Sequence, residues 1–275
     1  MDKLGLIAGG GALPISLAAH CHAVGRPLFI VRLKGFAGPE LAIYDSVESG
    51  VAELGRGISA LRRAGCTAIC LAGKVDRPDL ASLTPDFRGL AALPGAIAAA
   101  RKGDDGLLTF MIQEFEKEGF RVEGAHEVMN GLTLGKGALG RLIPCAQHMP
   151  DIQRALEAAR VIGGLDIGQA AVACDGLVLA LEAQEGTDAM LRRVAHLPHS
   201  LRGNPRQRRG VLAKSAKPGQ ELRVDLPTIG PETVRRAAVA GLAGIAGVAG
   251  QILVLHRAET IRLADQAGMF ILGVD

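Results

Sequence analysis

Two segments of the sequence combine acidic and basic residues in a way that suits phosphate chemistry. The first is Val211–Thr233, within which Lys214 and Lys217 precede an isolated acid. That acid is Asp225. The second is Leu179–Arg193, whose charged residues are Glu182, Glu185, Asp188, Arg192 and Arg193. Carboxylates can hold a hard cation, and the cationic side chains of lysine and arginine can bind phosphate oxygens. The two segments therefore favour hydrolysis of a phosphate ester or anhydride. The alternative is a solvated loop and the start of an ordinary amphipathic helix.

A glycine-rich turn, IAGGGALP at 7–14, lies between a predicted strand and a predicted helix. Such a turn exposes backbone N–H groups beside the positive end of the helix dipole, which suits a diphosphate or another anion. The turn departs from the GxGxxG dinucleotide pattern, because Leu13 or Pro14 stands where the third glycine would be. A plain strand-to-helix connection is the alternative.

Two further places could contact an anionic ligand. The loop GKVDRP at 73–78 follows a predicted buried strand, and loops after parallel strands face the ligand crevice. Lys74 and Arg77 could bind phosphate there, and Asp76 could orient one of them. The alternative is a solvated turn. His126 lies at the end of another predicted strand, where it could contact a ligand or serve a purely structural role.

Two charged runs have structural explanations beside functional ones. In KGDDG at 102–106, Asp104 or Asp105 would cap the helix that follows. The run RGNPRQRRG at 202–210 carries four arginines. A run of this kind is usually solvated, but it could also attract an anionic membrane surface.

The composition excludes several classes of protein. Of the 275 residues, 48% are apolar, which is too many for a disordered chain. Aromatic residues are scarce and the formal charge is only +3, so the chain is not expected to bind nucleic acid. The five cysteines include no CxxC pair, and Cys66 and Cys70 flank an apolar run, which predicts buried thiols rather than zinc ligands. The sequence shows neither a signal peptide nor a membrane-spanning run.

The first half of the sequence alternates predicted strands and helices. The strands are expected at 4–8, 27–33, 67–72 and 120–125, and the helices at 14–24, 54–64 and 107–118. Alternation of this kind predicts a parallel sheet covered by helices on both faces. We therefore predict an N-terminal α/β domain of Rossmann-like type over residues 1–130.

The glycines of NGLTLGKGALG at 130–140 predict a linker, which we place at 131–148. A second α/β domain, 149–275, would carry Asp225. In it, Asp175-Gly176 joins two apolar runs and predicts a β-hairpin. The small apolar run AVAGLAGIAGVAG at 238–250 predicts closely packed backbones, or alternatively the wall of an apolar pocket.

Taken in order, four segments make the chain resemble a known family. They are LGLIAGGGALP, LAGKVDRP, AVACDGLVLALEAQEGTDAMLRR and VLAKSAKPGQELRVDLPTIGPET. Together they resemble the UDP-2,3-diacylglucosamine pyrophosphatases of lipid A biosynthesis, of the type unrelated to metallophosphoesterases. The resemblance extends over essentially the whole chain.

The resemblance implies hydrolysis of UDP-2,3-diacylglucosamine to UMP and 2,3-diacylglucosamine 1-phosphate (lipid X). It implies Mg²⁺ or another divalent cation as cofactor, and an active-site cleft between the two domains. The expected location is the cytoplasm, with peripheral contact at the cytoplasmic face of the inner membrane left open. A homodimer is also left open.

The family's essential acid matches Asp225, which would serve as metal ligand or general base. Lys214 would be the second catalytic residue, and Glu182 and Asp188 would join Asp225 at the metal on chemical grounds. The predicted substrate-binding residues are Gly10, Gly11, Ala72, Gly73, Lys74, Val75, Asp76, Asp105, His126, Glu185, Gly186, Thr187, Asp188 and Lys217.

Two other classes of function compete with this prediction. The strand-GGG-helix opening is also compatible with a nicotinamide-dependent oxidoreductase, although the full fingerprint is missing. A non-catalytic carrier of a nucleotide sugar or lipid would need the same phosphate contacts as an enzyme.

Overall fold

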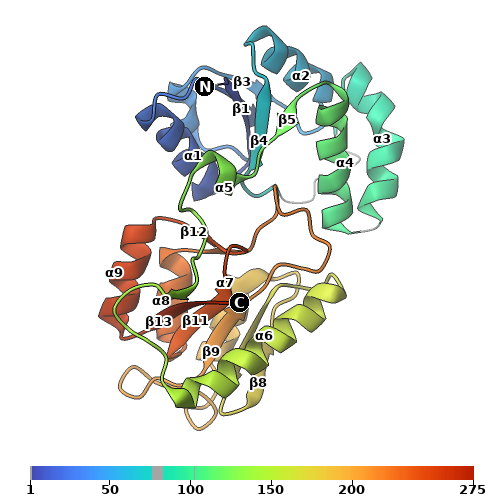
Figure 1. The fold of residues 1–275 in the computed structure, drawn as a ribbon. Helices are drawn as coiled ribbons and strands as arrows, with labels where there is room; N and C mark the ends of the chain where they lie inside the picture. Colours follow the sequence, from blue (N-terminus) through green and yellow to red (C-terminus); the bar gives the residue numbers. More distant parts are fainter. Residues whose placement is uncertain (1, 76–82, 102) are drawn as a thin grey trace. The chain divides into compact units, whose positions relative to one another are not determined.

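The structure, a computed structural model, describes residues 2–75, 83–101 and 103–275. It forms two compact units (Figure 1). Unit 1 comprises Met1–Asn130 together with Arg223–Asp225, and unit 2 comprises Gly131–Leu222 and Leu226–Asp275. The three-residue segment of unit 1 therefore interrupts the sequence of unit 2.

Unit 1 is built on a five-stranded parallel sheet of order β3-β2-β1-β4-β5. The strands are β1 (Leu4–Ala8), β2 (Leu28–Leu33), β3 (Ser46–Ser49), β4 (Ala68–Ala72) and β5 (Arg121–Val122). All five residues of β1 are buried, as expected for a central strand covered on both faces. The predicted parallel α/β sheet is confirmed. The strand order reverses between β1 and β4, and such a reversal opens a crevice at the carboxyl ends of the strands.

The helices of unit 1 are α1 (Ala12–Ala23), the short 3-10 helix η1 (Pro39–Ile43), α2 (Leu54–Arg63), α3 (Phe87–Ala100), α4 (Asp104–Lys117) and α5 (Ala125–Val128). The sequence analysis did not predict α3, which contains Pro94 in its interior. The helix begins at Asp86, whose carboxylate accepts a hydrogen bond from the Gly89 amide at 2.7 Å. The core of the unit includes Leu61, Ile69 and Ile112, all nearly inaccessible to solvent.

Unit 2 contains a six-stranded sheet of order β6-β13-β11-β9-β7-β8 and a two-stranded pair, β10-β12. The strands of the sheet are β6 (Gly137–Ala138), β7 (Ala170–Cys174), β8 (Leu177–Leu181), β9 (Val211–Lys214), β11 (Gly244–Val248) and β13 (Phe270–Val274). The pair is β10 (Thr228–Ile229) and β12 (Leu253–Val254). Strands β9, β11 and β13 are parallel, whereas β6, β7 and β8 are antiparallel to their neighbours, so this sheet is mixed.

The helices of unit 2 are η3 (Ala146–His148), α6 (Met149–Gly164), α7 (Gly186–Ala195), α8 (Pro231–Val239) and α9 (Arg257–Ala267). The predicted hairpin is confirmed as β7-β8. At its turn Asp175 and Gly176 have φ angles of 50° and 78°, the left-handed values that a two-residue hairpin turn requires. The Asp151 carboxylate accepts hydrogen bonds from both turn amides, at 3.1 and 2.8 Å.

Residues 131–148, predicted as a linker, belong to unit 2. Leu134 is 1% exposed within the core of this unit, and its amide donates to the Ile252 carbonyl at 2.7 Å. In the same segment, β6 pairs with β13. The segment is therefore part of a folded unit.

The run at 238–250 packs tightly, as one of its two interpretations predicted. It supplies β11, all of whose residues are buried. A Cβ atom on Gly244 would overlap the Phe270 ring, and one on Gly247 would lie 2.5 Å from a side-chain carbon of Ile252. Glycine at these positions therefore allows the neighbouring side chains to lie directly on the strand.

Four of the five cysteines are buried, which confirms the prediction for Cys66 and Cys70. Burial raises the pKa of the Cys70 thiol to about 12. A thiol of this kind stays protonated near neutral pH, which makes it a poor metal ligand.

The arginines of the 202–210 run bind backbone carbonyls within unit 2. Arg202 is 7% exposed and donates to the carbonyls of Leu197, Gly203, Ala240 and Ala195. Arg208 donates to the Ala238 carbonyl, and Arg209 pairs with Asp175 at 2.6 Å. Because α7 ends at Ala195 and α8 at Val239, the contacts with Ala195, Ala238 and Ala240 satisfy carbonyls at helix ends. Three of the four arginines therefore hold the fold together, which weakens the membrane interpretation of this run.

We expect Arg202→Ala to lower the free energy of unfolding by about 3 kcal/mol, because several buried carbonyls would lose their donor. The exposed Arg206 provides a control in the same run, and Arg206→Ala should change this free energy by less than about 0.5 kcal/mol. Urea denaturation of the full chain measures both. If both variants lost the same unfolding free energy, the hydrogen bonds from Arg202 to the buried carbonyls would not be what stabilises the fold.

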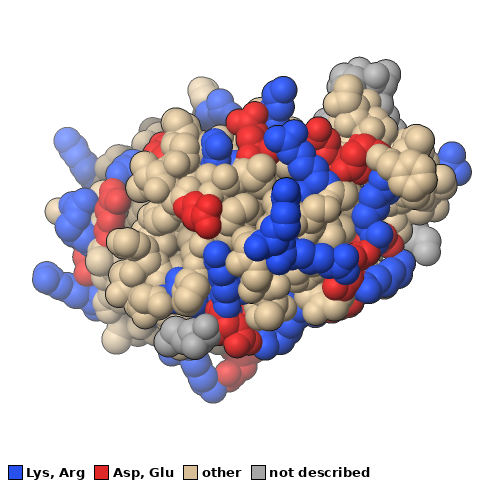
Figure 2. All heavy atoms as spheres, turned by 90° about the horizontal axis from the view of Figure 1, so that it is seen from above, with Lys and Arg blue, Asp and Glu red and all other residues tan. Residues whose placement is uncertain are grey.

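A buried ion cluster fastens one end of the unit 1 sheet. Glu123 is 9% exposed, and its carboxylate accepts two hydrogen bonds from Arg26, at 2.8 and 3.0 Å, and one from Arg121 at 2.5 Å. Burial raises the pKa of the Glu123 carboxyl, but the hydrogen bonds from the two arginines outweigh it and hold the pKa below its usual range. Basic side chains also lie beside acidic ones on the face shown in Figure 2.

We expect Glu123→Gln to cost about 3 kcal/mol of unfolding free energy at pH 7, because it breaks a buried charge cluster. The folded-state pKa is depressed, so this contribution is complete above the unfolded pKa of about 4.3 and is lost as the pH falls through the folded value. The difference between wild type and variant should therefore shrink between about pH 4.3 and the lower folded pKa. Urea unfolding at a series of pH values measures it, and a difference that stays constant down to pH 2 would refute this account.

Candidate active site

Two loops of unit 1 that the sequence analysis singled out separately are joined in the structure. The Gly10 amide donates to the Lys74 carbonyl at 2.8 Å, and the Lys74 amide donates to the Gly10 carbonyl at 2.9 Å. The Gly9 amide donates to the Ala72 carbonyl at 2.8 Å. These residues follow β1 and β4, so the pairing lies at the carboxyl ends of the strands where the crevice is expected.

The close approach of the two loops requires glycine. Gly73 has a φ of +96°, and a Cβ atom on it would lie 2.7 Å from the Gly10 carbonyl oxygen. A Cβ atom on Gly9 would lie 2.8 Å from the Lys74 carbonyl oxygen. The turn was expected to expose backbone N–H groups, but those of Gly9 and Gly10 donate to carbonyls of the neighbouring loop. An anion at this turn would be bound by the amides that follow, from Gly11 into the first turn of α1.

In unit 2, a chain of hydrogen bonds holds a buried lysine. The Lys214 ammonium donates to the Thr187 hydroxyl at 2.9 Å and to the Thr228 carbonyl at 3.1 Å. The Thr187 hydroxyl in turn donates to Glu182 Oε1 at 2.8 Å. The Gln169 amide donates to Glu182 Oε2 at 3.2 Å. Lys214 and Glu182 are only 4% and 6% exposed, so the network balances a buried cation with a buried anion.

The side chains of this network come from three secondary-structure elements. Lys214 is the last residue of β9, Glu182 directly follows β8, and Thr187 is the second residue of α7. Gly186 opens α7 with a φ of 78°, a conformation that side-chain-bearing residues rarely adopt. The result is an ammonium group beside the N-terminus of a helix, an arrangement suited to phosphate oxygens.

Comparison with known proteins decides the family. The chain matches the family model described as LpxI N-terminal domain over residues 3–132, and the one described as LpxI C-terminal domain over residues 135–272. It is 60% identical over 275 residues to "UDP-2,3-diacylglucosamine pyrophosphatase LpxI" of Caulobacter vibrioides. The match covers 100% of this chain and 98% of the relative. The chain belongs to the LpxI family. The resemblance inferred from the four sequence segments is confirmed, and the oxidoreductase alternative loses its support.

The LpxI family's two domain models meet close to the boundary between the units, at residues 132 and 135. The predicted site residues are distributed over both units. Unit 1 holds Gly10, Gly11, Ala72, Gly73, Lys74, Val75, Asp105, His126 and Asp225, and unit 2 holds Glu182, Glu185, Gly186, Thr187, Asp188, Lys214 and Lys217. Asp76 lies outside the described residues.

Asp225 lies in the short segment that the structure groups with unit 1, although the sequence analysis expected it in the C-terminal domain. Its neighbour Val224 packs against the unit 1 core. Arg223 pairs with Glu116 of α4 at 2.8 Å. These contacts fasten the segment to unit 1 on the N-terminal side of the acid.

His126 is a polar group of unit 1 with unused hydrogen-bonding capacity. It lies on α5, which packs on α1 and β4. Its Nδ1 atom is buried and has no hydrogen-bond partner among the described residues. A buried ring nitrogen of this kind is unusual in a native structure, which is consistent with the prediction that it contacts a ligand.

The other charged residues of unit 2 that were predicted to bind substrate or metal form ion pairs. Glu185 pairs with Arg193 at 2.5 Å, and a hydrogen bond from its own backbone amide, followed by Arg193, lowers the pKa of its carboxyl. Asp188 lies 3.4 Å from Arg236. Lys217 lies 2.5 Å from Asp166. The sequence analysis did not identify the partners Asp166 and Arg236, because they lie far from these residues in the sequence.

The carboxylates predicted to hold a metal differ in their surroundings. Both oxygens of Glu182 already accept hydrogen bonds, which suits a positioning role better than metal ligation. The side chain of Asp188 is 51% exposed, and Asp225 is half-buried. Aspartate oxygens are the ligands that Mg²⁺ prefers, so these two residues fit the ion chemically.

Among the described residues, Asp151, Cys174 and Asp175 form a cluster whose potential ligand atoms lie within 4.8 Å of one another. A structural role explains it, because Asp151 binds the hairpin amides and Asp175 pairs with Arg209. Burial, followed by the neighbouring acids, raises the pKa of the Cys174 thiol to about 11. We therefore assign this cluster to the hairpin rather than to a metal.

Within the part of the chain that the structure describes, no helix is long and apolar enough to cross a bilayer.

We expect Thr187→Val to lower the free energy of unfolding by about 2 kcal/mol, because it leaves Lys214 and Glu182 without their shared hydroxyl. Thr187→Ser keeps the hydroxyl and is the matched control, expected to lose less than half as much. Chemical denaturation of the two variants makes the comparison. If both are equally stable, the hydroxyl does not hold the network.

Proposed function

We propose that the chain hydrolyses the diphosphate bond of UDP-2,3-diacylglucosamine, releasing UMP and 2,3-diacylglucosamine 1-phosphate. The observation that carries this proposal is the match to a relative named for that activity, over the whole of this chain and 98% of the relative. The buried lysine beside the N-terminus of α7 supports it, because a diphosphate needs cationic and N–H donors. The paired glycine loops after β1 and β4 support it as well.

Lys214 is the proposed electrostatic catalyst. Its ammonium is held by Thr187 and Thr228 in surroundings that contain little water, where a charge acts more strongly on a phosphate oxygen than it would in bulk solvent. Glu182 compensates the charge of the lysine through Thr187 and keeps the ammonium in place. In this role Glu182 is a positioning residue.

In the proposed reaction, water attacks one phosphorus atom and the bridging P–O bond breaks. The electrons of that bond remain on the departing phosphate oxygen, whose charge Lys214 would stabilise. Asp225 is proposed either to accept the proton that the attacking water releases or to act as a metal ligand. If Mg²⁺ is bound, either Asp225 of unit 1 or Asp188 of unit 2 would be a ligand, and the ion would supply neutralisation of the phosphate charge.

The chain is further proposed to act in the cytoplasm, in peripheral contact with the inner membrane where a diacylated substrate resides. The arginine run at 202–210 contributes little to this proposal, because three of its arginines bind groups of unit 2. The two acyl chains named in the relative's substrate are its main support.

We expect Asp225→Ala to lower turnover of UDP-2,3-diacylglucosamine by roughly 10²–10⁴-fold, the range typical of a lost general base. Asp45→Ala is the control, because Asp45 is a well-exposed aspartate of unit 1 in a loose pair with Lys3. It should retain full turnover. Separation of UMP and lipid X after reaction with Mg²⁺ or with EDTA measures the effect, and EDTA should abolish turnover.

Three outcomes would change the proposal. Full activity of Asp225→Ala would remove the acid from the mechanism, and full activity in EDTA would remove the metal. Binding of the nucleotide lipid without any turnover by the wild type would favour the carrier function. Reaction in ¹⁸O-labelled water also identifies the attacked phosphorus, because the label appears in either UMP or lipid X.

A further inference from the structure

Helix α3 of unit 1, which packs against α4, leaves large apolar side chains exposed to solvent. The sequence of α3 is FRGLAALPGAIAAA, yet the only buried residue among those described in this helix is Gly89. Phe87 is 91% exposed and Leu90 is 58% exposed. An apolar helix with so little buried surface is a reasonable place to look for a bound ligand, partner or membrane.

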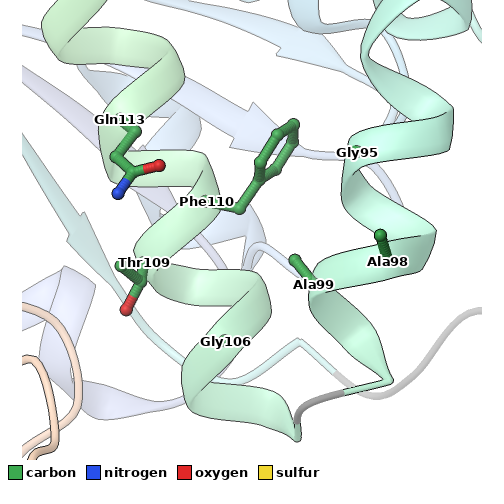
Figure 3. A pocket seen from close by; sticks show the side chains of 7 residues that line it. All are labelled: Gly95, Ala98, Ala99, Gly106, Thr109, Phe110 and Gln113. Carbon is green, nitrogen blue, oxygen red and sulfur yellow. The ribbon is translucent and has the colours of Figure 1, made fainter.

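A hollow of about 350 Å³ lies between the two helices. Its lining residues are Gly95, Ala98, Ala99, Gly106, Thr109, Phe110 and Gln113 (Figure 3). The Phe110 ring projects from α4 toward α3, and the methyl group of Ala99 points into the space between the helices. A Cβ atom on Gly95 would lie 2.7 Å from the Phe110 ring, so glycine at this position is what allows the ring to lie against α3.

The chemistry of the lining selects the kind of ligand. The described part of the lining consists of glycine backbone, alanine methyl groups and one aromatic ring, with two uncharged polar side chains and no charged side chain. A volume of about 350 Å³ lies at the small end of the range for ligand pockets. A flexible alkyl chain fits such a hollow, whereas a sugar, a nucleotide or a phosphate would leave its polar groups without partners.

A second hollow on the same helix pair has a different character. It measures about 240 Å³ and is lined in part by Arg88 and Glu114, which lie 3.7 Å apart. Arg88 also pairs with Glu118. An alkyl chain there would remove water from these charges, so only the first hollow suits it.

The hollow adjoins a residue that the sequence analysis predicted to bind substrate. Asp105, predicted to bind substrate, directly precedes Gly106 of the lining, at the start of α4. A head group bound at Asp105 would therefore have the hollow beside it, within reach of a chain attached to that head group.

We propose that the hollow between α3 and α4 binds one acyl chain of the diacylated substrate, with the chain lying over Ala98 and Ala99 and against the Phe110 ring. The inference rests on the proposed function for the identity of the substrate. It adds the place where the lipid part is recognised, and it makes this helix pair the determinant of acyl-chain specificity. Each methylene that the hollow covers strengthens binding about four-fold.

The first test fills the hollow and compares two substrates. Ala99→Leu places a larger side chain in the space that the acyl chain would occupy. Its matched control is Ala100→Leu, the same change at the next residue of α3, which does not line the hollow. We expect Ala99→Leu to lower kcat/KM by roughly 10-fold or more for a substrate with long acyl chains, and by less than about two-fold for a diacetyl analogue. Ala100→Leu should change neither value.

The second test detects the chain directly and does not depend on turnover. The sequence contains no tryptophan, so Phe110→Trp introduces a single fluorescent reporter into the hollow. Addition of 2,3-diacylglucosamine 1-phosphate with long chains should shift the emission to shorter wavelength. Glucosamine 1-phosphate, which has the head group without chains, should not.

The outcomes separate failure of this inference from failure of the proposed function. Equal effects of Ala99→Leu and Ala100→Leu on the long-chain substrate would overturn the acyl site while leaving the hydrolase intact. The same emission shift with vesicles of phosphatidylglycerol and phosphatidylethanolamine alone would assign the hollow to a membrane surface. A shift that depends only on protein concentration would assign it to a second copy of the chain. Absence of turnover by the wild type would instead refute the proposed function.

Discussion

The burial of the Lys214 ammonium constrains the architecture of unit 2, because its partners must come from separate elements of the fold. A charge that is 4% exposed is costly unless oxygen atoms surround it. The fold supplies them from places far apart in the sequence, namely Thr187 at the start of α7 and the Thr228 carbonyl in β10. Glu182, at the end of the β7-β8 hairpin, provides the opposite charge through the threonine hydroxyl. The register of the hairpin therefore matters to the lysine, because a shift of one residue would turn the side chains of β8 to the opposite face.

The main elements of the fold were predictable because they depend on local patterns. Alternating strands and helices predicted the parallel sheet of unit 1, and Asp175-Gly176 predicted the hairpin, since few residues other than asparagine, aspartate and glycine adopt the turn's left-handed φ angles. The helix α3 was not predicted, because Pro94 and Gly95 lie in its interior and both are poor helix formers. Its cap at Asp86 was the local signal that could have identified it.

The candidate site was harder to predict, because it depends on contacts between distant segments. The glycine turn and the loop after β4 could each be recognised from residue types, but their mutual hydrogen bonds at Gly10 and Lys74 could not. The same holds for the arginine run. Its composition suggested a solvated or membrane-facing surface. In the structure, however, the Arg202 side chain donates to backbone carbonyls, two of which lie at the ends of α7 and α8. Residue type predicted the available chemistry, and the tertiary fold determined where that chemistry is used.

The return of Arg223–Asp225 to unit 1 bears on how such a chain can evolve. The two family models divide the sequence into an N-terminal and a C-terminal part, as if each were an independent module. Yet an N-terminal part ending at residue 132 would lack Val224, which packs on its core, and the Arg223 partner of Glu116. Suppose recombination replaced the C-terminal part with that of a diverged homologue. The segment that packs on the unit 1 core would then be replaced as well, although the rest of unit 1 would stay unchanged. The two parts of the gene are thus expected to diversify together rather than be shuffled separately.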